Sequence, residues 1–312
     1  MASLVESLEN RKINDFRIDG RLQIVFDMET GDPDDFVTLL FLLGHPEVHL
    51  KAVTIVPGTP DQIGFIRYAL QRFNRSNLPL GVFKIDAKPA LSKFHLKIYP
   101  DAEITESTDA EDASEVLLSN CDEQTILVCG GPLKNLAKAI NTGRFRLGRL
   151  VAQGGFAGDN IVSKEKRLQK FNGRITCPTF NLCSDANAAK VVLNSTCIKE
   201  KYFVSKNVCH AVLYTIETHR QLEMIKDRSQ SLSEIFNMMS IYLKGSRKIA
   251  KAFHDPLAAC CAINLAIGQW ESVELYMDEK TREWGSRRSY SPNVKIIVDY
   301  DHEKFLSTFF TF

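Results

Sequence analysis

The chain of 312 residues carries almost no net charge and no long hydrophobic run. Lysine and arginine number 39 and aspartate and glutamate 38, so the formal net charge is +1. This balance gives no broad attraction to nucleic acid or to an anionic membrane. No apolar run approaches the ~20 residues of a membrane span, and the N-terminal MASLVESLENRKINDF lacks the apolar core of a secretory signal. We therefore expect a cytoplasmic protein that binds neither nucleic acid nor a membrane.

The chain also lacks any C-x-x-C pair, although it contains eight cysteines. A zinc ribbon and a thioredoxin-type motif are therefore not supported. Several of the cysteines lie in apolar runs, where cysteine packs as a small hydrophobe. Without an export signal, we expect these cysteines to be reduced thiols.

What the sequence does contain is a regular alternation of short strand-like runs and longer helical runs. This order is typical of a mostly parallel sheet with helices on both faces. We predict an α/β fold with an open, Rossmann-like sheet, formed as a single domain over residues 1–312 because no convincing linker divides the chain. The expected strands are RLQIVFD (21–27), VHLKAVTIV (48–56), TILVCGG (125–131), RLVAQGG (149–155), EKYFVS (200–205) and the start of NVKIIVDYDHEKFLSTFF (293–310).

Acidic side chains crowd the segment that follows the first expected strand: Asp27, Glu29, Asp32, Asp34 and Asp35 fall within nine residues. Like charges this close repel one another. Capping of the next helix explains one or two acids there but not five, so a cation site or an acid–base site is favoured. No Cys or His is interleaved, and oxygen ligands alone suit hard ions such as Ca²⁺ or, less favoured here, Mg²⁺.

Two motifs fit this acidic segment. DMETG superficially fits D-x-D-x-T, the nucleophile loop of haloacid-dehalogenase-type phosphatases, but no well-placed acidic pair follows near a later strand. The longer DMETGDPDD resembles the D-x-D-P-G-x-D-D signature of the inosine–uridine-preferring nucleoside hydrolases. The resemblance continues in order through LKAVTIVPG, TILVCGGPLKNLAKAI, LVAQGGFAGDN, CPTFNLCSDANAAKVVL, FHDPLAACCAI and the C-terminal VKIIVDYDHEKFLSTF.

The resemblance implies an enzyme that hydrolyses the N-glycosidic bond of a ribonucleoside or related ribosyl compound around a bound Ca²⁺. It implies a small-molecule substrate and a homodimer or homotetramer. Such chemistry builds oxocarbenium character on the sugar, and a metal-bound water with a nearby carboxylate suits it. A catalytically silent ribosyl-ligand binder on the same fold is the alternative, because the signature is altered.

The resemblance also assigns roles to the metal-binding residues. Glu29 stands at the position that contacts the ion and activates water, and Asp35 at a position that chelates it. Asp255 of the H-D pair matches a further ligand, and Cys129 a ligand through its main-chain carbonyl. Asp34 matches the residue that holds the ribose hydroxyls.

Other substrate contacts are matched less closely. Asn181 and Asn160 correspond to sugar contacts of the family. Thr59 and Thr179 stand where the family has Asn and Glu. Loss of the carboxylate at Thr179 suggests a 5′-substituted ribosyl substrate, for which the loop residues Lys164, Lys166, Arg167, Lys170 and Arg174 offer positive charge, unless they are simply solvated.

The remaining candidates support the site or protonate the leaving group. Asp27 and Asn135 are expected to brace the acidic loop and the G-P-L turn. The loop is one residue longer than the signature and has Glu29 in place of Asp, so Asp32 is an alternative ion ligand. His254, beside the matched aspartate, is the candidate acid for the departing base because histidine titrates near neutrality.

Overall fold

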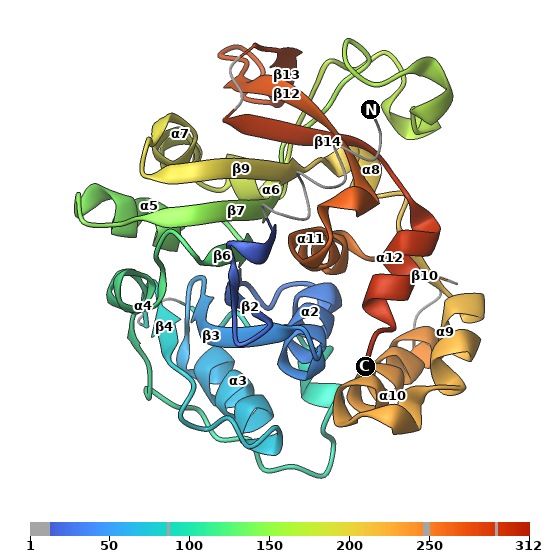
Figure 1. Cartoon of the computed structure of the whole chain (residues 1–312). Coiled ribbons are helices and arrows are strands. Elements are labelled where there is room, and N and C mark those ends of the chain that lie inside the picture. The colour runs from blue at the N-terminus through green and yellow to red at the C-terminus, as the bar shows by residue number, and fades with distance from the viewer. Residues whose placement is uncertain (1–12, 86–87, 246–249, 291–292) are drawn as a thin grey trace.

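The computed structural model describes residues 13–85, 88–245, 250–290 and 293–312. A large sheet runs through the molecule, and helices cover both of its faces (Figure 1). The predicted α/β fold with an open, mostly parallel sheet is therefore confirmed. Its strands are β1 (Arg17–Ile18), β2 (Arg21–Met28), β3 (Val48–Ile55), β4 (Leu80–Val82), β5 (Glu111–Asp112), β6 (Ile126–Cys129), β7 (Leu147–Gln153), β8 (Thr176–Cys177), β9 (Ile198–Val204), β12 (Gly268–Met277), β13 (Trp284–Arg288) and β14 (Val294–Tyr300).

The helices follow most of the strands, as the alternating pattern predicts. Those that matter for the site begin directly after a strand or a short turn. A separate two-stranded ribbon joins β10 (Leu213–Thr215) and β11 (Ala250–Ala252). The helices are α2 (Pro33–Gly44), α3 (Pro60–Arg72), α4 (Ala113–Asn120), α5 (Lys134–Asn141), α6 (Phe180–Cys183), α7 (Ala186–Asn194), α8 (Lys206–Cys209), α9 (Ile216–Glu223), α10 (Gln230–Gly245), α11 (His254–Ile263) and α12 (His302–Phe309).

The strand order is β5-β4-β3-β2-β6-β7-β9-β14-β12-β13-β8, with β1 paired to β2. Strands β5 to β14 of this order are parallel, and β12, β13 and β8 extend the sheet antiparallel. From β2 the chain runs outward through β3, β4 and β5, and then returns to β6 on the other side of β2. The gap above β2 and β6 is thus a topological switch point, where open α/β sheets bind their ligands.

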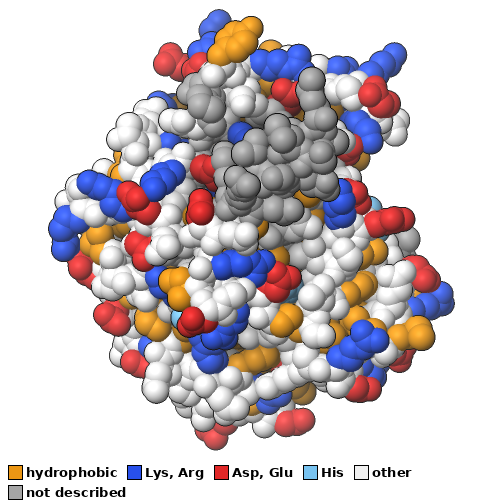
Figure 2. Space-filling model, viewed as in Figure 1, with side chains coloured by type: hydrophobic (Ala, Val, Ile, Leu, Met, Phe, Trp, Pro, Cys, Tyr) orange, Lys and Arg blue, Asp and Glu red, His pale blue; other side chains and the backbone are white. Residues whose placement is uncertain are grey.

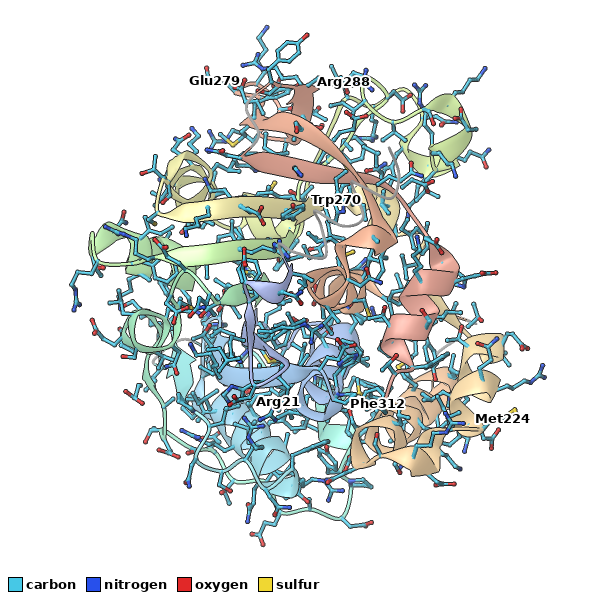
Figure 3. The ribbon with its side chains drawn as sticks, in the orientation of Figure 1. Arg21, Met224, Trp270, Glu279, Arg288 and Phe312 are labelled. Atoms are coloured by element: carbon cyan, nitrogen blue, oxygen red, sulfur yellow. The ribbon has the colours of Figure 1, made fainter. Side chains whose placement is uncertain are left out.

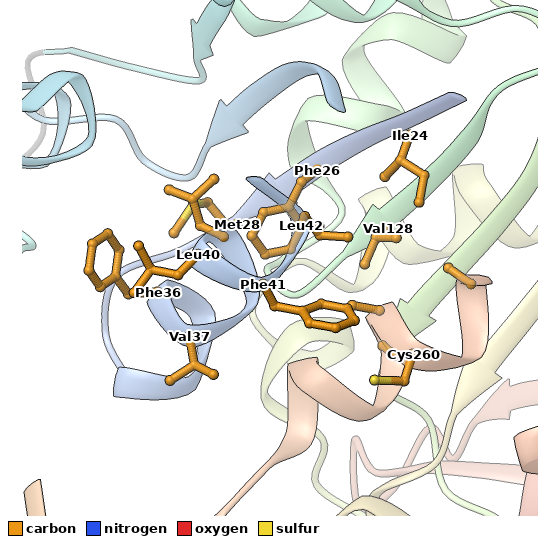
Figure 4. Packing of buried hydrophobic residues seen from close by; sticks show 14 of the residues in the cluster. Ile24, Phe26, Met28, Phe36, Val37, Leu40, Phe41, Leu42, Val128 and Cys260 are labelled. Carbon is orange, nitrogen blue, oxygen red and sulfur yellow. The ribbon is translucent and has the colours of Figure 1, made fainter. Parts of the chain in front are cut away.

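Alternation along β2 separates two hydrophobic cores. Ile24, Phe26 and Met28 belong to one core together with α2, α3, α10 and α11, and Figure 4 shows them beside the side chains of α2. Val25 belongs to the other core, with α4, α5 and α7. Because successive side chains of a strand point to opposite faces, Asp27 shares the face of Val25.

Local signals explain where the helices begin. Helix α2 has Pro33 in its first turn and two acids beside its positive dipole end. Helix α3 has a capping box between Thr59 and Gln62. Helix α7 begins after an aspartate cap, because Asp185 accepts a hydrogen bond from the backbone N–H of Ala188 at 2.9 Å.

On the face drawn in Figure 2, charges of both signs are present. Figure 2 shows basic and acidic side chains interspersed over the face in view.

At the C-terminus, Phe312 packs its ring 6.1 Å from that of Phe41, whereas Met224 between α9 and α10 is 86% exposed (Figure 3). All eight cysteines are free thiols. Among the described residues, none of the helices combines the length and apolarity needed to cross a bilayer.

Candidate active site

A cavity of about 240 Å³ lies at the switch point. Strand β2 ends at Met28 and delivers Glu29 to its wall, and the turn after β6 delivers Gly130. Five carboxylates line the cavity: Glu29, Asp32, Asp34, Asp35 and Asp255. Carboxyl ends of parallel strands meet at one edge of the sheet, which is why segments far apart in the chain converge here.

The acids meet because two helices begin side by side. Asp34 and Asp35 occupy the first turn of α2, and Asp255 is the second residue of α11, which packs against α2. One side-chain oxygen from each of the three lies within 4.8 Å of the others, and all three residues are buried. The structure thus brings Asp255 to the N-terminal acids, as the sequence suggests.

Mutual repulsion and burial disturb the protonation of this group. Burial, and then the neighbouring Asp255, Glu29 and Asp34, raise the pKa of Asp35 well above its usual value. Burial and the neighbouring Asp34 also raise the pKa of Asp255. The carboxyl groups of Asp35 and Asp255 are hydrogen-bonded to each other. Burial, with Asp32 and Asp34, raises the pKa of Glu29 to about 7. Carboxylates that resist ionisation together are stabilised by a cation.

Asp34 is the exception, because a lysine already compensates it. The Nζ atom of Lys251, on β11, lies 2.9 Å from Asp34 Oδ1 and 3.0 Å from Asp32 Oδ1. The backbone N–H groups of His254 and Asp255 donate to Asp34 Oδ2 at 2.8 and 3.2 Å. Burial alone would raise the pKa of Asp34, but Lys251 and these donors lower it. Asp34 is therefore a fixed, ionised acceptor.

The remaining donor set fits a hard divalent cation. Lys251 pairs with Asp32 and Asp34, whereas Glu29, Asp35 and Asp255 form no ion pair with any residue that the structure describes, although Lys251 partly offsets the charge of Asp255. All three offer carboxylate oxygens, the ligands that Ca²⁺ and Mg²⁺ prefer. Asp35 Oδ1 also accepts the backbone N–H of Glu29 at 3.1 Å, which fixes its orientation.

Asp27 lies beneath the acids and does not line the cavity. Its Oδ1 accepts hydrogen bonds from Thr54 Oγ1 at 2.6 Å and from Asn135 Nδ2 at 2.7 Å, and its Oδ2 accepts from Cys129 Sγ at 3.2 Å. Burial raises the pKa of Asp27 to about 6 despite these donors. Asp27 and Asn135 together tie β2, β3, β6 and the start of α5, in agreement with the supporting role that we expect for them.

The main chain after β6 reaches the cavity at Gly130 rather than at Cys129. Gly130 lines the cavity, and its carbonyl oxygen accepts from Asn181 Nδ2 at 2.8 Å. A Cβ atom on Gly130 would lie 2.8 Å from the carboxylate of Asp255, so only glycine lets that carboxylate approach. Cys129 lies behind this turn, with its thiol directed to Asp27 and its pKa raised well above normal by burial.

Two histidines lie at the rim of the acidic group. The rings of His254 and His210 are 4.5 Å apart, and both residues line the cavity. His254 is hydrogen-bonded to the backbone of Cys209, while its Nδ1 is buried without a partner. Its Nε2 is therefore the donor to the backbone, and Nδ1 offers a lone pair. Burial lowers the pKa of His254, with Asp34 opposing the shift.

The predicted sugar contacts divide into two groups. Asn181 and Thr179 line the cavity; Asn181 Nδ2 also donates to Gln153 Oε1 at 2.8 Å. Thr59 does not line it: Thr59 is buried at the start of α3 and bonded to Asp61 and Gln62. Asn160 does not line it either, and its amide donates to the carbonyl oxygen of Ser286 at 2.7 Å.

The basic loop 158–174 contributes less charge to the site than its composition suggests. Lys166 pairs with Asp299, Arg167 with Asp159 and Arg174 with Glu283. Lys170 contacts a residue that lines the cavity, because its Nζ lies 2.7 Å from Nδ1 of His210. None of these loop residues, Lys164 included, lines the cavity itself.

Sequence reasoning did not find several residues that line the cavity: Lys206, His210, Gln153, Phe180 and Gly130. It also missed Lys251, which does not line the cavity but pairs with Asp34. No local motif marks Lys251, because it meets Asp34 only through the ribbon of β10 and β11. A weak signal existed for Lys206, which follows a predicted strand and so lies at the edge where ligands gather.

Comparisons with known proteins agree with this geometry. A family model described as inosine-uridine preferring nucleoside hydrolase matches residues 24–307. An uncharacterised protein of Aquifex aeolicus (strain VF5) is 30% identical over 294 residues, which cover 91% of this chain and 96% of that protein. The pyrimidine-specific ribonucleoside hydrolase RihA of Enterobacter sp. (strain 638) is 24% identical, with 91% and 95% covered.

Solved structures share the fold. An inosine-guanosine nucleoside hydrolase has a TM-score of 0.67 and 18% identity, covering 92% of this chain and 97% of that one. A plant nucleoside hydrolase, the PpNRh1 enzyme, has a TM-score of 0.66 and 17% identity, covering 92% and 98%.

Proposed function

This chain belongs to the inosine–uridine preferring nucleoside hydrolase family, whose members are N-glycosyl hydrolases, and from this premise we propose a Ca²⁺-dependent hydrolase that splits a ribosyl compound into base and ribose. The observation that carries the proposal is the meeting of Asp34, Asp35 and Asp255 within 4.8 Å under a cavity at the switch point. We also propose that the enzyme is cytoplasmic and a homodimer or homotetramer, which stays an expectation from the family resemblance.

We assign a role to each residue from its charge and protonation state. Asp35 and Asp255 would hold the ion, with the Gly130 carbonyl beside them and Glu29 at its edge. A divalent ion bound there supplies a water of lowered pKa. Burial, with Asp32 and Asp34, raises the pKa of Glu29, and a divalent ion beside it would lower that pKa and favour the carboxylate that accepts the proton of an attacking water. Asp34, ionised and held by Lys251, accepts hydrogen bonds from the ribose 2′ and 3′ hydroxyls.

The base must leave with a proton. His254 is the candidate donor, because only Nδ1 is free to carry a proton toward the cavity. In its neutral form His254 donates Nε2–H to the backbone, so it acts as an acid only when Nδ1 is protonated as well. Burial lowers the pKa of His254, and the nearby Asp34 partly offsets that shift in favour of the charged form.

The test is base release from a panel of purine and pyrimidine ribosyl compounds, measured with and without a chelator. We expect release that a chelator abolishes and Ca²⁺ restores better than Mg²⁺. Release that persists in chelator would contradict the metal-dependent mechanism. Calorimetric binding of ribose without base release from any compound would contradict the hydrolase and indicate a ribosyl-ligand binder.

A further inference from the structure

Two groups of residues with unlike chemistry line the cavity. The five carboxylates form the group that we call the acidic end. Thr179, Lys206 and His210 form the other group, which we call the anion pocket. None of the three carries a negative charge, although they share one small cavity with Asp34 and Asp255. Such a division indicates a ligand that is itself polar at both ends.

Thr179 presents a hydroxyl that the protein leaves unused. The residue is only 2% exposed and lines the cavity, yet its Oγ1 has no hydrogen-bond partner. An unpaired buried hydroxyl is unfavourable, because it has lost its hydrogen bonds to water. A ligand group that accepts or donates a hydrogen bond at this point would recover that free energy.

Lys206 is anchored next to Thr179 in the chain. It is the first residue of α8, and its Nζ donates to the carbonyl oxygen of Pro178 at 2.7 Å, one residue before Thr179. The Cys177 side chain is also hydrogen-bonded to Lys206. An ammonium group has three N–H donors, so these two contacts anchor the charge and leave one donor for a ligand.

His210 adds a donor rather than an acceptor. Its Nδ1 lies 2.7 Å from Nζ of Lys170, an ammonium that can only donate. Nδ1 is therefore the acceptor, and the ring proton is on Nε2. Burial, then His254 and Lys170, lower the pKa of His210 to about 3, so the ring is neutral while Lys170 keeps its charge nearby.

We infer that the anion pocket binds a phosphate group, and that the substrate is a ribosyl compound with a phosphate on its 5′ oxygen. The inference rests on the proposed function, because it takes the 2′ and 3′ hydroxyls to be held at Asp34. With those hydroxyls at the acidic end, the ribose directs C5′ away from the carboxylates. A phosphate there accepts hydrogen bonds from Lys206, His210 and Thr179 at once.

The reaction remains a hydrolysis. The oxygen of water bonds to C1′ as the bond from C1′ to the base nitrogen breaks. The bonding electron pair and one proton go to the base, and the second hydrogen of water stays on the new hydroxyl. The products are the free base and ribose 5-phosphate, and the phosphate ester is untouched.

The first experiment compares kcat/KM for inosine and uridine with kcat/KM for their 5′-monophosphates, using the full chain with Ca²⁺. We expect at least one monophosphate to be preferred over its nucleoside by roughly tenfold or more, the equivalent of one charge-assisted contact. Preference for the unmodified nucleosides overturns the inference and leaves the proposed hydrolase intact.

A binding measurement keeps the two proposals separate if no compound is hydrolysed. Calorimetry of ribose 5-phosphate against ribose reports on the anion pocket without any turnover. Roughly tenfold tighter binding of ribose 5-phosphate supports the inference even if the hydrolase proposal has failed. Equal affinity overturns the inference whatever the activity.

Matched variants locate the effect. Lys206→Gln should lower the ratio of monophosphate to nucleoside kcat/KM about tenfold. Lys199→Gln is the control, because Lys199 lies at the opposite end of β9 and pairs with Glu123. Thr179→Glu sets a carboxylate against the phosphate and should lower the ratio further. Because both rates come from the same preparation, partial unfolding cancels from the ratio. An unchanged ratio in Lys206→Gln contradicts the inference.

Discussion

The two ends of the cavity were assembled in different ways. At the acidic end, four of the five carboxylates come from one run of nine residues, so the sequence displays the charge openly. At the anion pocket, Thr179 comes from the segment after β8, whereas Lys206 and His210 come from the two ends of α8, after β9. The acidic end is thus a local motif, whereas the anion pocket exists only after the sheet has formed. The first end is strained by repulsion, and the second is not.

The largest effect on activity should come from replacing Asp255, the acid that α11 contributes to the acidic end. Asp255→Asn is expected to lower kcat/KM by about 10³-fold or more, because a buried metal ligand is lost. The same change should raise the free energy of unfolding in chelator by ~1–3 kcal/mol, since a repelling carboxyl is removed from beside Asp35. Activity assays and denaturant unfolding measure the two.

Opposite signs of those two effects are the expected signature of a cation site. Asp122→Asn, which removes a half-exposed surface acid, is the control for handling and folding. If Asp255→Asn is both inactive and less stable in chelator, the carboxylates do not repel one another as described, and the contrast between the two ends disappears.

Lys251 tests whether the acidic end depends on a partner from elsewhere in the fold. Lys251→Met leaves Asp34 buried without its ion-pair partner, and breaking a buried pair costs about 3–5 kcal/mol. The double variant Lys251→Met, Asp34→Asn removes both charges and should recover most of that loss. Urea unfolding of the wild type, of the single variants Lys251→Met and Asp34→Asn, and of the double variant gives the coupling free energy. A value near zero would show that the pair contributes nothing.

How far the sequence predicts each part follows from these same residues. Strands and helices were predictable because Ile24, Phe26 and Met28 alternate with side chains of the opposite face, and because helix starts such as Asp185 carry their own caps. The acids were predictable as a local run. Lys251 and His210 were not, because their partners are remote in the chain. The sequence pointed to the Cys129 carbonyl, whereas Gly130 is the residue of this turn that lines the cavity. The role of the Cys129 carbonyl as a metal ligand stays a prediction. The roles of Thr59 and Asn160 stay predictions.

The pH dependence of stability that Glu29 causes should be opposite in sign to the one that His210 causes. This difference sharpens the comparison between the acidic end and the anion pocket. The pKa of Glu29 is raised from 4.5 to about 7, so between these values the folded state binds more protons than the unfolded state. Stability therefore falls as the pH rises through that window, by up to ~3 kcal/mol for this group. Unfolding in chelator from pH 4 to 8 should show this fall in the wild type and a shallower fall in Glu29→Gln.

At the anion pocket the sign is reversed and the effect is smaller. The pKa of His210 is lowered from 6.5 to about 3, so below pH 6.5 the unfolded state binds more protons and stability is lost as the pH falls. Because the His210 ring is partly exposed, screening reduces the stability lost between pH 7 and pH 5 to roughly 1 kcal/mol. His210→Gln should make that acid limb of the unfolding profile shallower. Lys170→Gln should do the same to a lesser degree, since it removes one of the charges that keep His210 neutral. An acid limb that both variants leave unchanged would mean that the two ends of the cavity do not differ in their response to protons.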